Sequence, residues 1–260
     1  MQLYFQSYPE SLRGSPPVII VPGLFGSSSN WRSFARSLGD HFDVYVVDQR
    51  NHGRSPHAAS QSYQDMVQDL MEFIEFHGID QAMLCGHSMG GKTAMVFSLL
   101  HSERVAKLAV LDIAPVAYSH SHAPFLRELL KIDLQRLGSR AEADRALKQA
   151  IADSATRLFL LQNLSGSPLN YKWRINLRVL FDYMSEIIGF PSDELAKLST
   201  EIPCQFISGG LSDYMQPAYQ QVAKEYFPKS DFIKIAQAGH WLQIEQPKAV
   251  FKALLEFLNK

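Results

Sequence analysis

Short apolar runs alternate along the chain with stretches in which apolar residues recur at helical spacing. Val18–Val21 and Val44–Val47 are continuous runs of the kind found in strands that are buried on both faces. Between residues 62 and 77, apolar residues return every three or four positions, which predicts an amphipathic helix. Strands and helices that alternate in this way are typical of a mostly parallel sheet with helices on both faces. We therefore predict an α/β protein with a doubly wound sheet.

The same pattern places the remaining elements. Further strands are expected at 82–85, 105–113, 204–208 and 232–235, and further helices at 31–38, 92–100 and 247–258. From residue 116 to 200 the strand alternation disappears and the sequence is helical in character. Ser139 and Glu142 are spaced as a capping box there, and a loop is expected at 165–168. We expect a core domain of residues 1–115 and 201–260, with 116–200 inserted as a helical unit after the strand that ends near Asp112.

Residues 1–7 allow two interpretations. Leu3 and Phe5 have the β character of an edge strand, whereas the string from Leu3 to Ser7 also resembles the remnant of an engineered protease site. Both interpretations stay open, and no function is assigned to this segment.

Composition and charge exclude several classes of function. The chain has 260 residues, with 25 Lys and Arg against 26 Asp and Glu, so its formal net charge is -1. This balance gives no electrostatic footprint for nucleic acid or for an anionic membrane, and neither partner is expected. No apolar run approaches the roughly 20 residues that span a bilayer, and no signal peptide is visible. We expect a cytoplasmic protein in which Cys85 and Cys204 are inert free thiols.

One short motif points to nucleophilic catalysis. Residues 86–90 match G-x-S-x-G and lie between an apolar strand and a helix, which is the setting of a nucleophile elbow. The flanking glycines suit a turn in which backbones approach too closely for a Cβ atom. We predict that Ser88 is the nucleophile; the plain alternative is a strand-to-helix turn with a solvated serine.

A serine hydroxyl needs a base to take its proton, and His240 is the best candidate. It follows the last predicted strand, at the sheet edge where the elbow also lies. His120 and His122 have a spacing that could suggest a metal, but no carboxylate or cysteine is placed beside them. We therefore expect no metal site.

Two aspartates could orient the base. Asp112 follows the strand after the elbow helix, and Asp213 follows the next strand along the chain. Both fit the chain order nucleophile, acid, base, so the residues alone leave the choice open. Backbone amides of Leu24 and Met89 are the expected oxyanion donors, because one follows the first strand and the other follows the nucleophile.

Several strings together resemble the α/β-hydrolases and, more narrowly, the YbfF-like esterases. The strings are G-L-F-G at 23–26, D-Q-R-N-H-G-R-S-P at 48–56, G-H-S-M-G-G-K at 86–92, D-I-A-P-V at 112–116 and A-G-H-W at 238–241. The resemblance implies a carboxylesterase that needs no cofactor and has residues 116–200 as a helical cap over the site. It also favours Asp112 as the acid. One departure is Pro22, where relatives usually carry histidine.

The predicted activity is the hydrolysis of short- to medium-chain acyl esters through Ser88, His240 and Asp112. The alternatives are an acyl-CoA thioesterase or a carbon–carbon bond hydrolase with the same triad, and a binding protein that only keeps the scaffold. A thioesterase would suit a basic rim, for which Arg127, Lys131, Arg136 and Arg140 are candidates. The partner is then a small acyl ester or thioester, while the sequence leaves the oligomeric state undetermined. Substrate contacts are expected from Phe25, His87, Trp241, Phe159, Phe181 and Tyr183.

Overall fold

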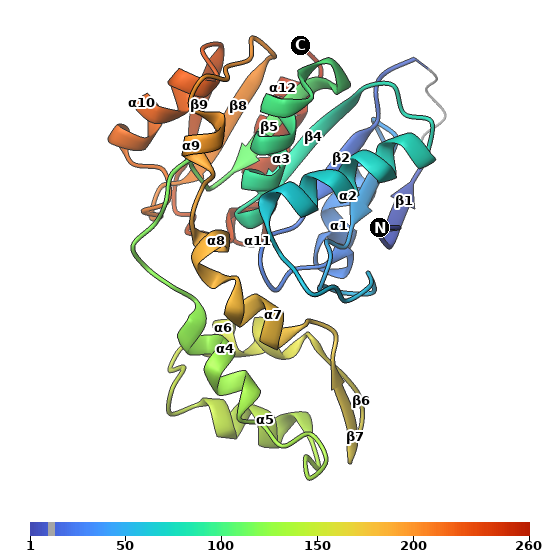
Figure 1. Cartoon of the computed structure of the whole chain (residues 1–260), viewed down its shortest axis with the longest axis vertical. Helices are drawn as coiled ribbons and strands as arrows, with labels where there is room; N and C mark the ends of the chain where they lie inside the picture. Colours follow the sequence, from blue (N-terminus) through green and yellow to red (C-terminus); the bar gives the residue numbers. More distant parts are fainter. Residues whose placement is uncertain (10–13) are drawn as a thin grey trace.

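The computed structural model describes residues 1–9 and 14–260, and its centre is a twisted sheet (Figure 1). Within these residues, seven strands form this sheet in the order β1-β3-β2-β4-β5-β8-β9. β1 pairs antiparallel with β3, and every other neighbouring pair is parallel. The strands are β1 (Phe5–Tyr8), β2 (Val18–Val21), β3 (Val44–Val47), β4 (Ala82–His87), β5 (Val105–Leu111), β8 (Cys204–Gly209) and β9 (Ser230–Ile235).

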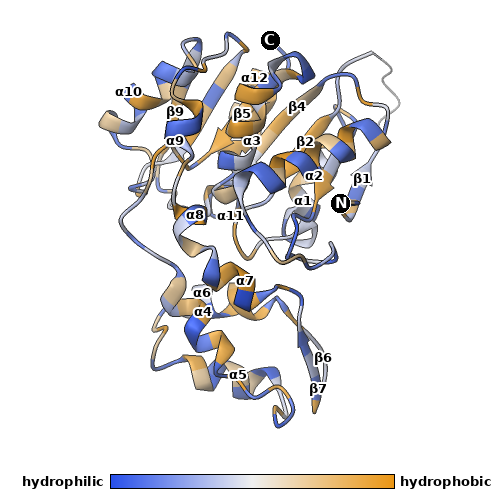
Figure 2. Cartoon of the chain, in the orientation of Figure 1, coloured by the Kyte–Doolittle hydropathy of each residue, from blue (hydrophilic) through white to orange (hydrophobic). Residues whose placement is uncertain are grey.

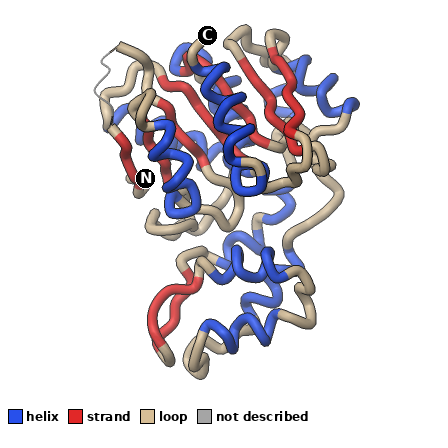
Figure 3. The backbone as a smooth tube through the Cα atoms, turned by 180° about the vertical axis from the view of Figure 1, so that it is seen from behind, coloured by secondary structure: helices blue, strands red, loops and turns tan. Residues whose placement is uncertain are grey.

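Helices cover both faces of the sheet, which confirms the doubly wound architecture. One apolar cluster joins the sheet to α2, α3 and α10, and a second cluster on the opposite face joins it to α1 and α12. Figure 3 shows the second face from behind, and Figure 2 shows that the strands are largely hydrophobic. The core helices are α1 (Arg32–Leu38), α2 (Tyr63–Phe76), α3 (Met89–Leu100), α10 (Pro217–Tyr226), α11 (Leu242–Glu245) and α12 (Pro247–Leu258), with 3₁₀ turns at Ser28–Trp31 and Ser102–Arg104.

Most of residues 116–200, called the insertion below, lies beyond the carboxyl ends of the strands, whereas its last helix, α9, lies beside the sheet (Figure 1). Helix α5 begins as predicted, since the Ser139 hydroxyl accepts a hydrogen bond from the Glu142 amide. The Glu142 carboxylate accepts from the Gly138 amide rather than completing a capping box. The elements of the insertion are α4 (Ala123–Leu130), α5 (Arg140–Leu147), α6 (Ser154–Leu161), β6 (Leu164–Ser167), β7 (Asn170–Trp173), α7 (Leu177–Asp182), α8 (Met184–Ile188) and α9 (Ser192–Leu195).

The expectation of a plain loop at 165–168 is wrong, because β6 and β7 form an antiparallel hairpin there. Its strands are mostly exposed, so they lack the apolar run that marked the core strands. Gly166 has φ +108°, and a Cβ atom on it would lie 2.2 Å from the Asn170 carbonyl oxygen. The hairpin therefore depends on a glycine that by sequence suggested only a turn.

The N-terminal residues form an edge strand. β1 extends the sheet beyond β3, and the Phe5 ring packs edge-on against Phe73 at 5.4 Å between ring centroids. Cys85 and Cys204 lie buried on β4 and β8 as free thiols, as predicted. Burial raises the pKa of Cys85 to about 12, which keeps this thiol protonated. In the described part of the chain, no helix is both long and apolar enough to cross a bilayer.

Candidate active site

Ser88 lies on a sharp turn between the central strand β4 and helix α3. Its backbone has φ 53° and ψ -123°, a strained combination for a residue with a Cβ atom. Glycines on both sides make the turn possible. A Cβ on Gly86 would lie 2.4 Å from the Gly90 carbonyl oxygen, and one on Gly90 would lie 2.1 Å from that of Val21. The turn thus leaves the Ser88 hydroxyl at the carboxyl end of the sheet.

Replacing Gly90 with alanine is expected to lower both stability and activity. The added methyl group must displace the backbone after β2, which carries the Leu24 amide, so we expect a loss of about 1–3 kcal/mol in unfolding free energy. Urea denaturation and ester turnover measure the two effects. Gly138→Ala is the matched control, because its Cβ would meet only the flexible Glu142 carboxylate, at 3.1 Å. Equal stabilities for the two variants would contradict this account.

Three side chains from separate parts of the sequence form a hydrogen-bonded chain. The Ser88 hydroxyl lies 3.0 Å from His240 Nε2, and His240 Nδ1 lies 2.8 Å from Asp112 Oδ2. If Nδ1 carries the proton that it donates to Asp112, Nε2 is free to accept the proton of Ser88. Asp112 follows β5, the neighbour of β4, and His240 follows β9. The parallel sheet therefore brings all three to one edge.

The Asp112 carboxylate is buried and accepts hydrogen bonds from neighbouring groups, whereas Asp213 is exposed. Asp112 Oδ1 accepts from the Gly209 amide at 2.9 Å, and Oδ2 accepts from the Ser212 hydroxyl. Its backbone φ is 50°, a second strained residue at the site. Asp213 is exposed in the loop after β8. Of the two candidate acids, the structure brings only Asp112 into contact with His240.

Two aromatic rings flank the imidazole of His240. Tyr214 stacks on it with 4.1 Å between ring centroids and 23° between planes, and His87 lies 4.8 Å away. His87 Nε2 lies 2.9 Å from the His240 carbonyl oxygen, and burial lowers the pKa of His87 to about 3. His87 therefore stays neutral and serves packing rather than proton transfer. Tyr214 could not be singled out from the sequence, where only its place beside Asp213 marks it.

Leu24 and Met89 border the same small space as Ser88, and no hydrogen-bond acceptor is found for their backbone amides among the described residues. Met89 opens the 12-residue helix α3, whose first amides lack partners within the helix. The loop before Leu24 is held by Gln49, whose side-chain amide donates to the Pro22 carbonyl oxygen at 2.7 Å. Gln49 in turn accepts a hydrogen bond from Thr93 of α3. These two hydrogen bonds tie the loop that contains Pro22 to helix α3.

A cavity of about 240 Å³ opens onto Ser88 and His240. It lies between the core and the insertion, and its lining is largely apolar. Four of the predicted substrate contacts line it: Phe25, His87, Phe159 and Trp241. Leu160 also lines it, and residues that were not predicted as substrate contacts complete much of the wall, namely Trp31, His122, Phe125, Tyr214 and Ile244.

Phe181 and Tyr183 do not line this cavity. Phe181 lies on α7, where Arg127 Cζ lies over its ring at 5.8 Å from the ring centroid. Tyr183 sits between α7 and α8 and packs against the main apolar cluster. Helix-packing aromatics and pocket aromatics have the same local pattern, so only the arrangement of the helices separates them.

The His120–His122 pair has an aromatic environment rather than a metal site. His120 Nε2 lies 2.6 Å from the Tyr214 hydroxyl, and burial lowers the pKa of His122 to about 4. Among residues 1–9 and 14–260, no group of three His, Cys, Asp or Glu side chains could hold a metal ion.

Comparisons with known proteins establish the family of this chain. The model of the family described as the alpha/beta hydrolase fold matches residues 16–247. The chain belongs to the α/β-hydrolase family. Esterase YbfF of Escherichia coli is 34% identical to this hydrolase over 96% of each chain. The sn-1-specific diacylglycerol lipase ABHD11 of Mus musculus is 34% identical over 94% of this chain and 81% of its own length.

Among solved structures, one described as a marine microorganism esterase superposes on this hydrolase with a TM-score of 0.92. Its sequence is 38% identical, and the match covers 98% of this chain and 99% of the other. The resemblance to YbfF-like esterases is thereby confirmed, and the chain is a hydrolytic enzyme.

Proposed function

We propose that this α/β-hydrolase is a serine carboxylesterase with Ser88 as nucleophile, His240 as base and Asp112 as the acid that orients the base. The observation that carries the proposal is a pair of consecutive contacts beside an apolar cavity. Ser88 Oγ lies 3.0 Å from His240 Nε2, and His240 Nδ1 lies 2.8 Å from Asp112 Oδ2. Nucleophile, base and orienting carboxylate within hydrogen-bond reach are the requirements for this chemistry.

The reaction runs in two halves. Ser88 Oγ attacks the ester carbonyl carbon while His240 Nε2 takes the hydroxyl proton, and the Leu24 and Met89 amides bind the carbonyl oxygen as it gains negative charge. His240 then gives the proton to the departing alcohol, which leaves an acyl group on Ser88. Water attacks this acyl-enzyme with His240 again as base, and the carboxylic acid is released.

The cavity supports acyl esters of short to medium length as substrates. Its apolar wall suits an alkyl chain, and the wall comes partly from α4 and α6 of the insertion, which would act as a cap. Relatives named as an esterase and as a diacylglycerol lipase support the same substrate class.

Chain-length preference is expected to depend on Phe159. Removing this ring deletes apolar contact with a longer acyl chain, so Phe159→Ala should lower kcat/KM for p-nitrophenyl octanoate about tenfold and that for the acetate ester much less. Phe181→Ala is the matched control, since this half-buried ring lies outside the cavity. A panel of p-nitrophenyl esters measures both variants. Equal losses on acetate and octanoate would refute this role for Phe159.

The basic side chains considered for a thioesterase are engaged within the insertion. Lys131 pairs with Glu128 at 2.7 Å, and Arg136 lies 3.6 Å from Asp133. Arg140 donates to the Leu161 carbonyl oxygen at 2.7 Å. These basic residues do not line the cavity, so they give no support to binding of coenzyme A. No contact at the site favours carbon–carbon bond hydrolysis over ester hydrolysis.

A further inference from the structure

Lys92 is a buried cation whose role the proposed reaction leaves unassigned. It lies in α3 one turn after Ser88, and its amide donates to the Ser88 carbonyl oxygen at 3.1 Å. The residue is 1% exposed, and within residues 1–9 and 14–260 no acidic side chain forms an ion pair with it. Burial lowers the pKa of Lys92 to about 7. An ammonium group removed from water needs an acceptor for each of its three N–H bonds.

Three backbone carbonyl groups supply those acceptors. Lys92 Nζ lies 2.8 Å from the Val116 oxygen, 2.8 Å from the Ile188 oxygen and 2.5 Å from the Gly189 oxygen. Val116 belongs to the connection that leads from β5 into the insertion, whereas Ile188 and Gly189 lie where the chain leaves α8 toward the sheet. Both connections are visible between the sheet and the insertion in Figure 1. One side chain of the nucleophile helix therefore binds both ends of the insertion.

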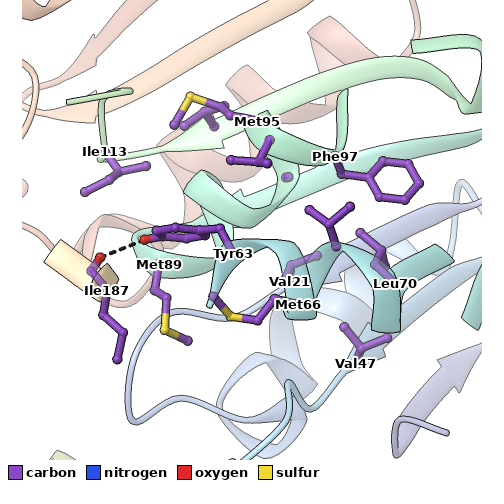
Figure 4. Packing of buried hydrophobic residues seen from close by; sticks show 14 of the residues in the cluster. Val21, Val47, Tyr63, Met66, Leu70, Met89, Met95, Phe97, Ile113 and Ile187 are labelled. Carbon is purple, nitrogen blue, oxygen red and sulfur yellow. Dashed lines mark hydrogen bonds between the residues drawn. The ribbon is translucent and has the colours of Figure 1, made fainter. Parts of the chain in front are cut away.

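Neighbouring contacts reinforce the same junction. The Tyr118 amide donates to the Ile188 carbonyl oxygen at 3.1 Å, which joins the two connections directly, and the Tyr118 ring lies 4.7 Å from Lys92 Nζ. The Tyr63 hydroxyl of α2 donates to the Ile187 carbonyl oxygen at 2.7 Å (Figure 4). The last carbonyl groups of a helix lack partners within it and favour a cation, as Lys92 provides for α8.

The position of this junction matters because the insertion carries part of the cavity wall. Phe125 of α4 and Phe159 and Leu160 of α6 face the cavity on Ser88. A space of about 20 Å³, enough for one water molecule, lies between Ser88 and Lys92. The junction that Lys92 forms is one of the links that join this wall to the core and so to Ser88.

We propose that Lys92 is a positioning residue that fixes both connections of the insertion to helix α3. By doing so it holds the cavity wall formed by Phe125, Phe159 and Leu160 at a set distance from Ser88. It touches neither the ester nor the reacting atoms. Loss of its three hydrogen bonds loosens the insertion, and longer acyl chains, which need the wall, are affected most. The kinetic part of this inference rests on the proposed esterase function, whereas its structural part does not.

Hydrogen exchange in Lys92→Met tests the structural part. Methionine keeps the length and the apolar stem but cannot donate, so exchange at the Tyr118 amide is expected to rise tenfold or more, while β4 and β5 stay protected. Lys107→Met is the matched control. Lys107 Nζ also donates to helix-end carbonyl groups, at 2.6 Å to Leu258, but these lie in α12 of the core. Unchanged Tyr118 exchange in Lys92→Met would overturn the proposal.

Kinetics separate positioning from a direct charge effect. In Lys92→Met, the ratio of kcat/KM for p-nitrophenyl octanoate to that for the acetate is expected to fall about tenfold, with no change of ratio in Lys107→Met. An equal fall for both esters would assign Lys92 to the oxyanion charge instead and would overturn the proposal. If the methionine variant does not fold, Lys92→Gln, which keeps two N–H donors, replaces it in both experiments. Absence of ester turnover in the unmodified enzyme would refute the esterase alone, and the exchange result would still decide the role of Lys92.

Discussion

Ser88→Ala is expected to reduce ester hydrolysis by roughly a million-fold in kcat, because the variant has no group that can form the acyl-enzyme. The fold should survive, since the change removes one oxygen at a partly exposed position. Turnover of p-nitrophenyl butyrate measures the loss. Mass spectrometry after treatment with a fluorophosphonate should show one adduct, on the peptide with Ser88, in the unmodified enzyme and none in the variant.

A second serine on the same helix provides the control. Ser98 of α3 is fully buried and donates to the Ala94 carbonyl oxygen at 2.8 Å. Ser98→Ala removes a hydroxyl of the same chemistry, so it should cost about 1 kcal/mol of stability and leave turnover and labelling in place. Residual turnover in Ser88→Ala near that of Ser98→Ala would mean that a different group is the nucleophile.

Asp112→Asn is expected to lower kcat by about four orders of magnitude. The asparagine side chain keeps the shape of the carboxylate but carries no negative charge. If its oxygen still accepts from the Gly209 amide, its NH2 group faces His240 Nδ1 and cannot accept the Nδ1–H hydrogen bond. His240 then takes the wrong tautomer and the imidazolium that forms in the reaction loses its counter-charge. Initial rates at saturating ester measure kcat, and circular dichroism checks that the buried substitution leaves the fold intact.

Asp213→Asn is the matched variant for this comparison. Asp213 is exposed one residue after Ser212, whose hydroxyl donates to Asp112. Neutralising it should change kcat by less than about tenfold, because an exposed charge is screened by water and salt. A larger loss for Asp213→Asn than for Asp112→Asn would reverse our assignment of the acid.

The core could be predicted from sequence because its strands are continuous apolar runs and its helices are amphipathic. Strands at Val18–Val21 and Val44–Val47 and the helix that ends at Leu258 lie where the pattern placed them. The β6–β7 hairpin was missed, since exposed strands carry no such run. Ser88 and His240, which the structure brings within 3.0 Å, could be named as candidates because each follows a recognisable strand. Tyr214 and Lys92 were not given roles, because stacking on an imidazole and binding distant carbonyl groups leave no local pattern.

By itself, the sequence indicated the family, the elbow motif around Ser88 and the positions of the core strands and helices along the chain, since these depend on local periodicity and on glycines required by a tight turn. Only the tertiary structure shows that Asp112 rather than Asp213 contacts His240, that Phe159 but not Phe181 lines the cavity, and that Lys92 binds both connections of the insertion. The physical reason is that these distinctions depend on distances between residues far apart in the chain, which packing of the sheet and helices sets and which no local pattern encodes.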